Sequence, residues 1–261
     1  MAIPMVASPA SAFVRETVDG SPDTPLFWAS RAIEVRPAYT SSTDVPESAL
    51  RSAVLRALST WETAGDGCTD IALTAGEPPT GLETSLGGAS RDGENRVVWR
   101  EDEWTEDPSA LALTTLIYRR DTGEILDADI DINGVDHFWT VTDDPGAVVT
   151  DVQNTVTHEL GHVLGFGHSE EVEATMYGRS PPGETKKRDL DTDDVAAVCT
   201  VYPFGEPTPG GLGVVHGGLT SASSCAVHGP PSATPAGAPA MLLAALALLW
   251  LRRRFPNRRC R

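Results

Sequence analysis

The segment that decides the fold is HELGHVLGFGH, residues 158–168. His158 and His162 are four residues apart, so on a helix their side chains project from one face. Two imidazoles placed in this way can take neighbouring corners of a tetrahedral zinc site. Gly165 allows the positive φ with which a chain leaves a helix sharply, so His168 can turn back as a third ligand. Three protein ligands leave a fourth position for water, which is typical of a catalytic zinc.

Glu159 stands next to the first histidine, where its carboxylate can reach a metal-bound water without binding the metal. Such a carboxylate accepts the proton of the water and later delivers it to the leaving amine. We therefore expect a zinc-dependent endopeptidase with one Zn2+ on His158, His162 and His168, and with Glu159 as general base. The alternative is a non-catalytic surface binding module that keeps zinc for structure only, and such a site does not need this carboxylate.

The elements around this segment predict an α/β (α+β) domain. One helix is expected to begin at 44–47 with Asp44 as its cap and to end at Gly65. The helix of the 158–168 segment is expected to open with a capping box made by Thr150 and Gln153 and to end near Gly165. A last helix is expected from about 191 to 202, and residues 76–93 are expected to form a long loop. Strands are predicted over residues 32–35, 71–74, 96–99, 111–118 and 125–132.

The charge of the chain is strongly negative. The 261 residues carry a formal charge of −17, and residues 205–261 hold six arginines and one acid. The remaining part, residues 1–204, therefore has 14 basic and 36 acidic side chains, a formal charge of −22. Such a surface repels phosphate backbones, so we expect no nucleic-acid partner. The expected partners are protein or peptide substrates, and we expect a monomer.

Only two of the four cysteines, Cys68 and Cys199, lie in the part of the chain that is predicted to fold. There is no C-x-x-C pair, which argues against a zinc site built on cysteine. In an exported domain, two such cysteines predict one disulfide, whereas a cytosolic chain would keep two free thiols.

The two ends of the chain differ from its middle. Residues 1–24 are expected to be an N-terminal arm or the remainder of a signal peptide. Residues 204–239 are rich in Gly, Pro, Ser and Ala and predict a flexible linker. Residues 240–261 begin with twelve apolar residues, and a helix of that length rises about 18 Å against a hydrocarbon core of about 30 Å. We expect membrane contact through this marginal segment before processing.

The zinc-binding pattern, followed eight residues later by Met176 and Tyr177, resembles the metzincin clan. In that clan the methionine of a Met-turn packs beneath the zinc histidines. Within the clan, the chain is most similar to matrixins at residues 123–139, at Met176-Tyr177 and at residues 191–203. The resemblance covers about residues 25–203. It implies a zincin catalytic domain with a twisted mixed sheet, an active-site helix and a C-terminal helix. It also implies a secreted or cell-surface enzyme acting on extracellular proteins, whose extended substrate adds to the edge strand, here residues 111–118.

The chain also departs from the matrixin pattern. Gly178 follows Tyr177 where matrixins usually have proline, and no cysteine-switch propeptide is visible before Pro25. The histidine cluster for a second, structural zinc is missing, because His137 is the only other histidine before residue 205. Neither latency nor a structural zinc is therefore implied by the resemblance.

Acidic residues alternate with apolar ones along the predicted strand at 125–132. Asp127, Asp129, Asp131 and Asn133 offer oxygen atoms that could bind Ca2+. The simpler interpretation is an exposed strand face on which acidic residues alternate with apolar ones.

The C-terminal tail resembles a surface-sorting signal of some Gram-negative bacteria, the MYXO-CTERM class. The resemblance rests on Cys225, a Pro/Ala spacer, the apolar stretch and the arginines that follow it. It implies that the arginines stay in the cytoplasm, that the catalytic domain faces outward and that Cys225 is the point of processing. The alternative is a plain single-span anchor.

Overall fold

The computed structural model describes residues 12–87 and 92–208, and the backbone of residues 219–226. Its main element is a six-stranded sheet with the strand order β10-β5-β6-β4-β2-β3. Neighbours among β2, β3, β4 and β6 pair in parallel, whereas β5 runs antiparallel to both β6 and β10. The mixed sheet confirms the predicted α/β class. The strands are β2 (Ala32–Pro37), β3 (Ala72–Ala75), β4 (Asn95–Arg100), β5 (Ala110–Tyr118), β6 (Ile125–Asn133) and β10 (Leu219–Ala226).

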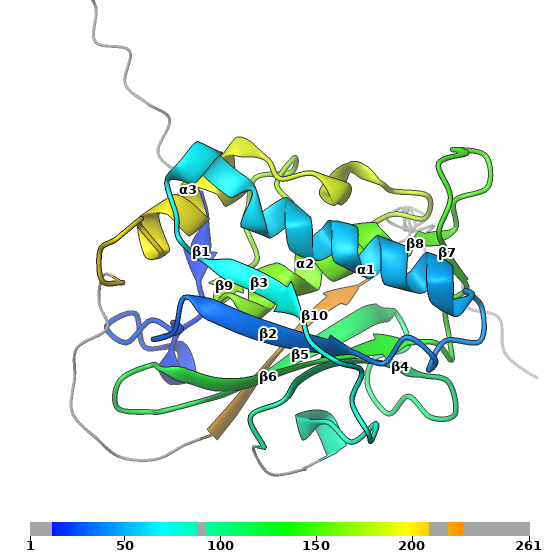
Figure 1. The fold of residues 1–261 in the computed structure, drawn as a ribbon, viewed down its shortest axis with the longest axis horizontal. Coiled ribbons are helices and arrows are strands. Elements are labelled where there is room, and N and C mark those ends of the chain that lie inside the picture. The colour runs from blue at the N-terminus through cyan, green and yellow to red at the C-terminus, as the bar shows by residue number, and fades with distance from the viewer. Residues whose placement is uncertain (1–11, 88–91, 209–218, 227–261) are drawn as a thin grey trace, which may run out of the picture. The chain divides into compact units, whose positions relative to one another are not determined.

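Two helices pack against each other on one face of this sheet, α1 (Glu47–Glu62) and α2 (Val152–Val163) (Figure 1). The buried face of α1 contains the predicted apolar residues, including Leu58 and Trp61. The indole nitrogen of Trp61 donates to the carbonyl oxygen of Thr157 in α2 at 2.8 Å, so the two helices are joined by a polar contact inside an apolar interface. The third helix, α3 (Thr192–Val201), begins at a capping box made by Asp191 and Asp194.

Short elements extend the domain at both ends. β1 (Val14–Arg15) pairs with β9 (Phe166–Gly167), and β7 (Trp139–Thr140) pairs with β8 (Thr150–Asp151). Short 3-10 turns lie at Val18–Gly20, Ala64–Gly67, Ser85–Gly87 and Lys186–Arg188. We expected residues 12–24 to form an arm, but they pack on the domain, because β1 pairs with β9, the strand that follows α2. Strand β10 likewise lies inside the segment 204–239, which composition alone predicts to be a linker.

The predicted start of the zinc helix is displaced by one residue. The N-cap of α2 is Asp151, whose side chain accepts from the backbone N–H of Asn154 at 2.8 Å. The expected capping box of Thr150 and Gln153 is wrong, because Thr150 belongs to β8 and the Gln153 side chain accepts from Arg56. Asp44, the expected cap of α1, instead accepts from the backbone N–H of Trp139, and Pro46 is the N-cap.

The end of α2 is fixed by side chains that satisfy its last carbonyl groups. Gly165 has φ +85 and leaves the helix as predicted. The indole of Trp28 donates to the carbonyl of Val163 at 2.7 Å, and the hydroxyl of Tyr202 donates to that of Leu164 at 2.7 Å. Helix carbonyls in the last turn have no partner within the helix, so these two bonds hold the end that precedes His168.

Cys68 and Cys199 form a disulfide, as predicted, with 5.3 Å between their Cα atoms. The bond joins the segment after α1 to α3. It closes a large loop across the domain, since the two cysteines are 131 residues apart.

The acidic face of β6 is buried, so the expectation of an exposed face is wrong. The exposed fractions of Asp127, Asp129 and Asp131 are 1%, 2% and 0%. Asp129 accepts from the backbone N–H of Ser85 at 2.8 Å and of Arg96 at 2.9 Å, so the carboxylates fasten the loop over the sheet. Oδ2 of Asp127 accepts from the backbone N–H of Asp92 and Gly93, whereas its Oδ1 is buried without a hydrogen-bond partner. Among the residues that the structure describes, these carboxylates do not form a group of three that could share a metal ion.

Within the described ranges no helix has both the length and the apolar character needed to cross a membrane. The apolar stretch 240–251 and the arginines after it lie outside those ranges. The expectations of an anchor or a sorting signal therefore concern residues that the structure does not describe.

Candidate metal centre

Three histidine side chains from two adjoining segments meet at one point. His158 and His162 lie on α2, and His168 follows β9. The Nε2 atom of His168 lies 3.3 Å from Nε2 of His158 and 3.2 Å from Nε2 of His162. In the described part of the chain this is the one group of three or more side chains able to share a metal ion. The arrangement brings together the three ligands expected from the sequence.

Hydrogen bonds fix which nitrogen of each helical histidine faces the shared point. Nδ1 of His158 lies 2.6 Å from the carbonyl oxygen of Thr175, and Nδ1 of His162 lies 2.7 Å from that of Phe166. A carbonyl oxygen only accepts, so each Nδ1 carries the proton and each Nε2 keeps a free lone pair. Burial lowers the pKa of His158 well below its ordinary value and that of His162 to about 3, so both rings are neutral.

The residues fit a zinc ion. The Nε2 lone pairs of His158 and His162 both face Nε2 of His168, and a cation can bind such a cluster of imidazole nitrogens. Zinc binds histidine nitrogen at about 2.0–2.1 Å, and a tetrahedral arrangement then separates two such nitrogens by about 3.3–3.4 Å. The two measured separations, 3.2 and 3.3 Å, agree with that value. Carbonyl partners on the far nitrogens are also the usual way in which metal-binding histidines are oriented.

Glu159 is buried beside this point. Its Oε2 atom accepts from the hydroxyl of Thr114 on β5 at 2.6 Å, whereas its Oε1 atom is buried without a protein partner. Burial raises the pKa of Glu159 to about 8, and the bond from Thr114 opposes that rise. A buried carboxylate oxygen without a partner is costly, which indicates that a water or a substrate group completes this site.

Met176, the expected Met-turn methionine, lies against the helix that carries His158 and His162. Met176 is buried against α2 at Gly161, where a Cβ atom would overlap the sulfur of Met176. Asp194 of α3 holds this segment, because its carboxylate accepts from the backbone N–H of Thr175 at 2.7 Å and of Met176 at 3.0 Å. Tyr177 closes the turn by donating its N–H to the carbonyl of Ala174 at 3.1 Å.

Gly178 explains one departure from the matrixin pattern. A Cβ atom at this position would lie 2.7 Å from Nδ1 of His168, closer than atoms approach without a shift. A proline would place a Cβ there as well. The glycine therefore lets the chain pass close behind the third histidine.

Lys187 is a buried cation behind the same segment, and no pattern in the sequence singled it out. Its ammonium group donates to the carbonyls of Tyr177 and Arg179 at 2.5 and 3.0 Å, and it lies 3.7 Å from the carboxylate of Glu184. Two carbonyls and a carboxylate compensate the buried charge. The two bonds to carbonyls also join the turn at 186–188 to residues 177–179.

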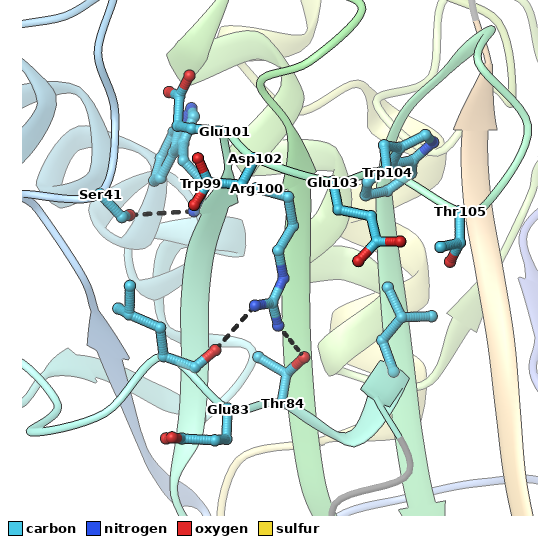
Figure 2. Close-up of a pocket in the computed structure, with 12 residues that line it drawn as sticks. Ser41, Glu83, Thr84, Trp99, Arg100, Glu101, Asp102, Glu103, Trp104 and Thr105 are labelled. Atoms are coloured by element: carbon cyan, nitrogen blue, oxygen red, sulfur yellow. Dashed lines mark hydrogen bonds between the residues drawn. The ribbon is translucent and has the colours of Figure 1, made fainter. Parts of the chain in front are cut away.

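One cavity beside the sheet is separate from the histidines. A cavity of about 730 Å3 lies between residues 82–86 and 99–105, and none of the metal-centre residues lines it. Figure 2 shows Arg100 reaching across it, with hydrogen bonds to the carbonyl of Leu82 at 2.9 Å and the hydroxyl of Thr84 at 2.5 Å. Arg100 also pairs with Asp131 at 2.5 Å, so this region fastens the loop over the acidic face.

Comparison with known proteins adds a family likeness to this geometry. Residues 101–203 match the family model Peptidase_M10, Matrixin. Metalloendoproteinase 1-MMP of Arabidopsis thaliana is 46% identical over 67 residues, 24% of this chain and 18% of that protein. Metalloendoproteinase 1 of Glycine max is 37% identical over 71 residues, 26% of this chain and 23% of that protein. Matrilysin of Homo sapiens is 34% identical over 67 residues, 26% of this chain and 24% of that protein.

The likeness is thus to metalloendopeptidases, and it is local. The matched segment contains β5, β6, α2, the three histidines, Glu159 and α3. The aligned stretches span only about a fifth of the length of the relatives. Three residues of the site, Thr114, Asp194 and Lys187, were not found from the sequence. The position of Asp194 in a capping box is the one signal that could have pointed to it.

Proposed function

We propose that this chain is a zinc-dependent endopeptidase that hydrolyses peptide bonds of proteins. His158, His162 and His168 hold the metal, Glu159 is the general base, and Met176 and Tyr177 form the supporting turn. The observation that carries the proposal is the meeting of three imidazole Nε2 atoms beside a buried carboxylate with one oxygen unpartnered. The same oxygen favours catalysis over a purely structural zinc, which would need no such group.

The residues divide the chemistry between them. Zinc, when bound, supplies a Lewis acid that polarises the substrate carbonyl and makes a water acidic near neutral pH. Glu159 accepts the proton of that water on Oε1, while the Thr114 hydroxyl holds Oε2 and fixes the plane of the carboxylate. Glu159 then gives the proton to the nitrogen of the leaving amine, so one carboxylate acts first as base and then as acid.

The proposal includes the environment of the enzyme. The disulfide between Cys68 and Cys199 supports an exported protein, because such bonds persist in oxidising compartments. We place the catalytic domain at 25–203, preceded by the packed residues 12–24, and propose that it acts as a monomer on extracellular proteins. Residues 240–261 would contact the membrane before the chain is processed near Cys225. In this proposal the C-terminal tail is a surface-sorting signal.

Hydrolysis by the purified full-length chain tests the proposed function. We expect cleavage of an unfolded protein, with products identified by mass spectrometry, loss of cleavage after a chelator, and recovery on adding one equivalent of Zn2+. Absence of cleavage in a zinc-loaded chain, measured also after removal of residues 209–261, would reject an endopeptidase.

Mass spectrometry of the mature protein from its native host tests the tail. The sorting interpretation predicts a C-terminus near Cys225. Recovery of intact peptides from residues 252–261 in the mature surface form would instead support the plain anchor.

A further inference from the structure

The outer edge of β5 is covered by a segment of the chain's own C-terminal region. β10 pairs antiparallel with β5 from Leu219 opposite Tyr118 to Ala226 opposite Ala110, with one irregularity between Cys225 and Ala226. On its other side β5 pairs with β6. Figure 1 shows β10 as the orange strand at this end of the sheet. The strand that we expected to be a free edge is therefore paired on both sides.

The register brings β10 past the candidate metal centre. Thr114, the residue of β5 that donates to Glu159 at 2.6 Å, lies opposite Ser223. Helix α2, which carries Glu159 and two of the histidines, approaches both β5 and β10. The backbone around Ser223 is thus the part of β10 that passes beside the catalytic carboxylate.

Under the proposed function, this edge is where an extended peptide substrate would bind. Along a strand, successive backbone groups point alternately to its two neighbours, so one half of the N–H and C=O groups of β5 bond to β6. The other half form the edge to which an extended peptide can add. β10 pairs with these backbone groups over the whole length of β5, so a substrate and β10 cannot occupy the edge together.

The composition of the segment suits this role. Residues 219–226, LTSASSCA, contain no charged residue and no proline, and they are small around the position opposite Thr114. The chain from Thr208 needs only residues 209–218 to reach them. A short tether of this kind gives an effective concentration on the order of millimolar, so even weak strand pairing would compete with a substrate.

We propose that residues 219–226 occupy the peptide-binding edge of the chain's own active site and hold the intact chain latent until this strand is displaced or removed. The occupancy stands on the strand register, whereas the latency rests on the proposed function. At an effective concentration of about 1 mM, a tenfold loss of activity corresponds to a strand affinity of about 0.1 mM.

Full-length variants with a disrupted β10 test this directly. The double substitution Ala222→Pro/Ser223→Pro removes two adjacent backbone N–H groups, one of which must point toward β5. The matched control is Gly213→Pro/Val214→Pro, two prolines before the strand. In a Glu159→Gln background, which keeps the chain intact, hydrogen exchange within residues 110–118 should be at least tenfold faster in the β10 variant and unchanged in the control.

Activity gives the second readout. With Glu159 present, the β10 variant should hydrolyse a reporter peptide about tenfold faster than the unmodified chain. Adding a synthetic peptide of residues 219–226 should reverse this gain. Equal exchange rates in residues 110–118 for the unmodified and β10-variant chains would overturn the proposal. Faster exchange without hydrolysis by any variant would keep the occupancy but reject both the latency and the proposed enzyme.

Discussion

Thr114→Val removes the side-chain hydrogen bond of Glu159, the proposed general base. Valine has nearly the shape of threonine, so the substitution removes the hydroxyl that lies 2.6 Å from Oε2 of Glu159 and little else. A hydrogen bond to a charged group contributes about 1.5–3 kcal/mol. If that amount is expressed in the transition state, at about 1.36 kcal/mol for each factor of ten, kcat should fall about 10- to 150-fold. The three histidines are untouched, so zinc content should stay at one per chain and KM should change little.

Thr115→Val is the matched control. Thr115 is the next residue of β5 and is also buried, but its hydroxyl has no hydrogen-bond partner. Steady-state hydrolysis of a reporter peptide by the two variants, with metal content measured on the same samples, provides the comparison. Equal kcat values for both would show that Thr114 does not orient Glu159, and the account of the base would then be wrong.

Three further outcomes follow from the structure. Replacing Cys68 and Cys199 by alanine should lower the free energy of unfolding by about 4–5 kcal/mol, since the bond closes a loop of 131 residues; a denaturant titration showing no change would contradict this. Burial raises the pKa of Asp127 to about 6, so the folded state binds this proton more tightly and stability should fall as the pH rises from about 4 to 6. Asp127→Asn should flatten that slope and add up to about 3 kcal/mol at pH 7, measured without calcium. Stabilisation of the unmodified chain by Ca2+ that this variant loses would instead support a calcium site. Gly178→Ala should displace the third histidine and weaken zinc binding in a competition with a chelator, whereas Gly146→Ala, where a Cβ has room, should not.

The three candidate ligands could be selected from local patterns, because they lie within eleven consecutive residues. The helix period sets His158 and His162 on one face, and a positive φ at Gly165 returns the chain to His168. Five of the six strands of the sheet were also close to their predicted ranges, since apolar runs bounded by turn residues mark them.

Other features depend on contacts between distant residues, and periodicity does not report those. Thr114 meets Glu159 across 45 positions, and no pattern within either segment shows the pair. Alternating acids on a strand usually indicate a solvated face, but the loop that contains Ser85 donates its backbone N–H to Asp129 and buries that face.

Strand β10 shows a different limit. Its small polar residues resemble a linker, since pairing with an edge uses backbone groups that every residue carries.

The cap of α2 differs from the predicted one because it also depends on a contact between distant residues. Asp151 is held by an ion pair with Arg188 at 2.5 Å, 37 positions away, and this bond places Asp151 at the start of the helix.

The most direct test of the central claim is peptide hydrolysis by Glu159→Gln at full zinc occupancy. Glutamine keeps the size of the side chain and its contact with Thr114 but cannot accept the proton of a water. The account predicts one zinc per chain, as in the unmodified protein, and a loss of turnover by several orders of magnitude. Near-normal turnover in the zinc-loaded variant would contradict the claim that Glu159 is the general base of a zinc endopeptidase.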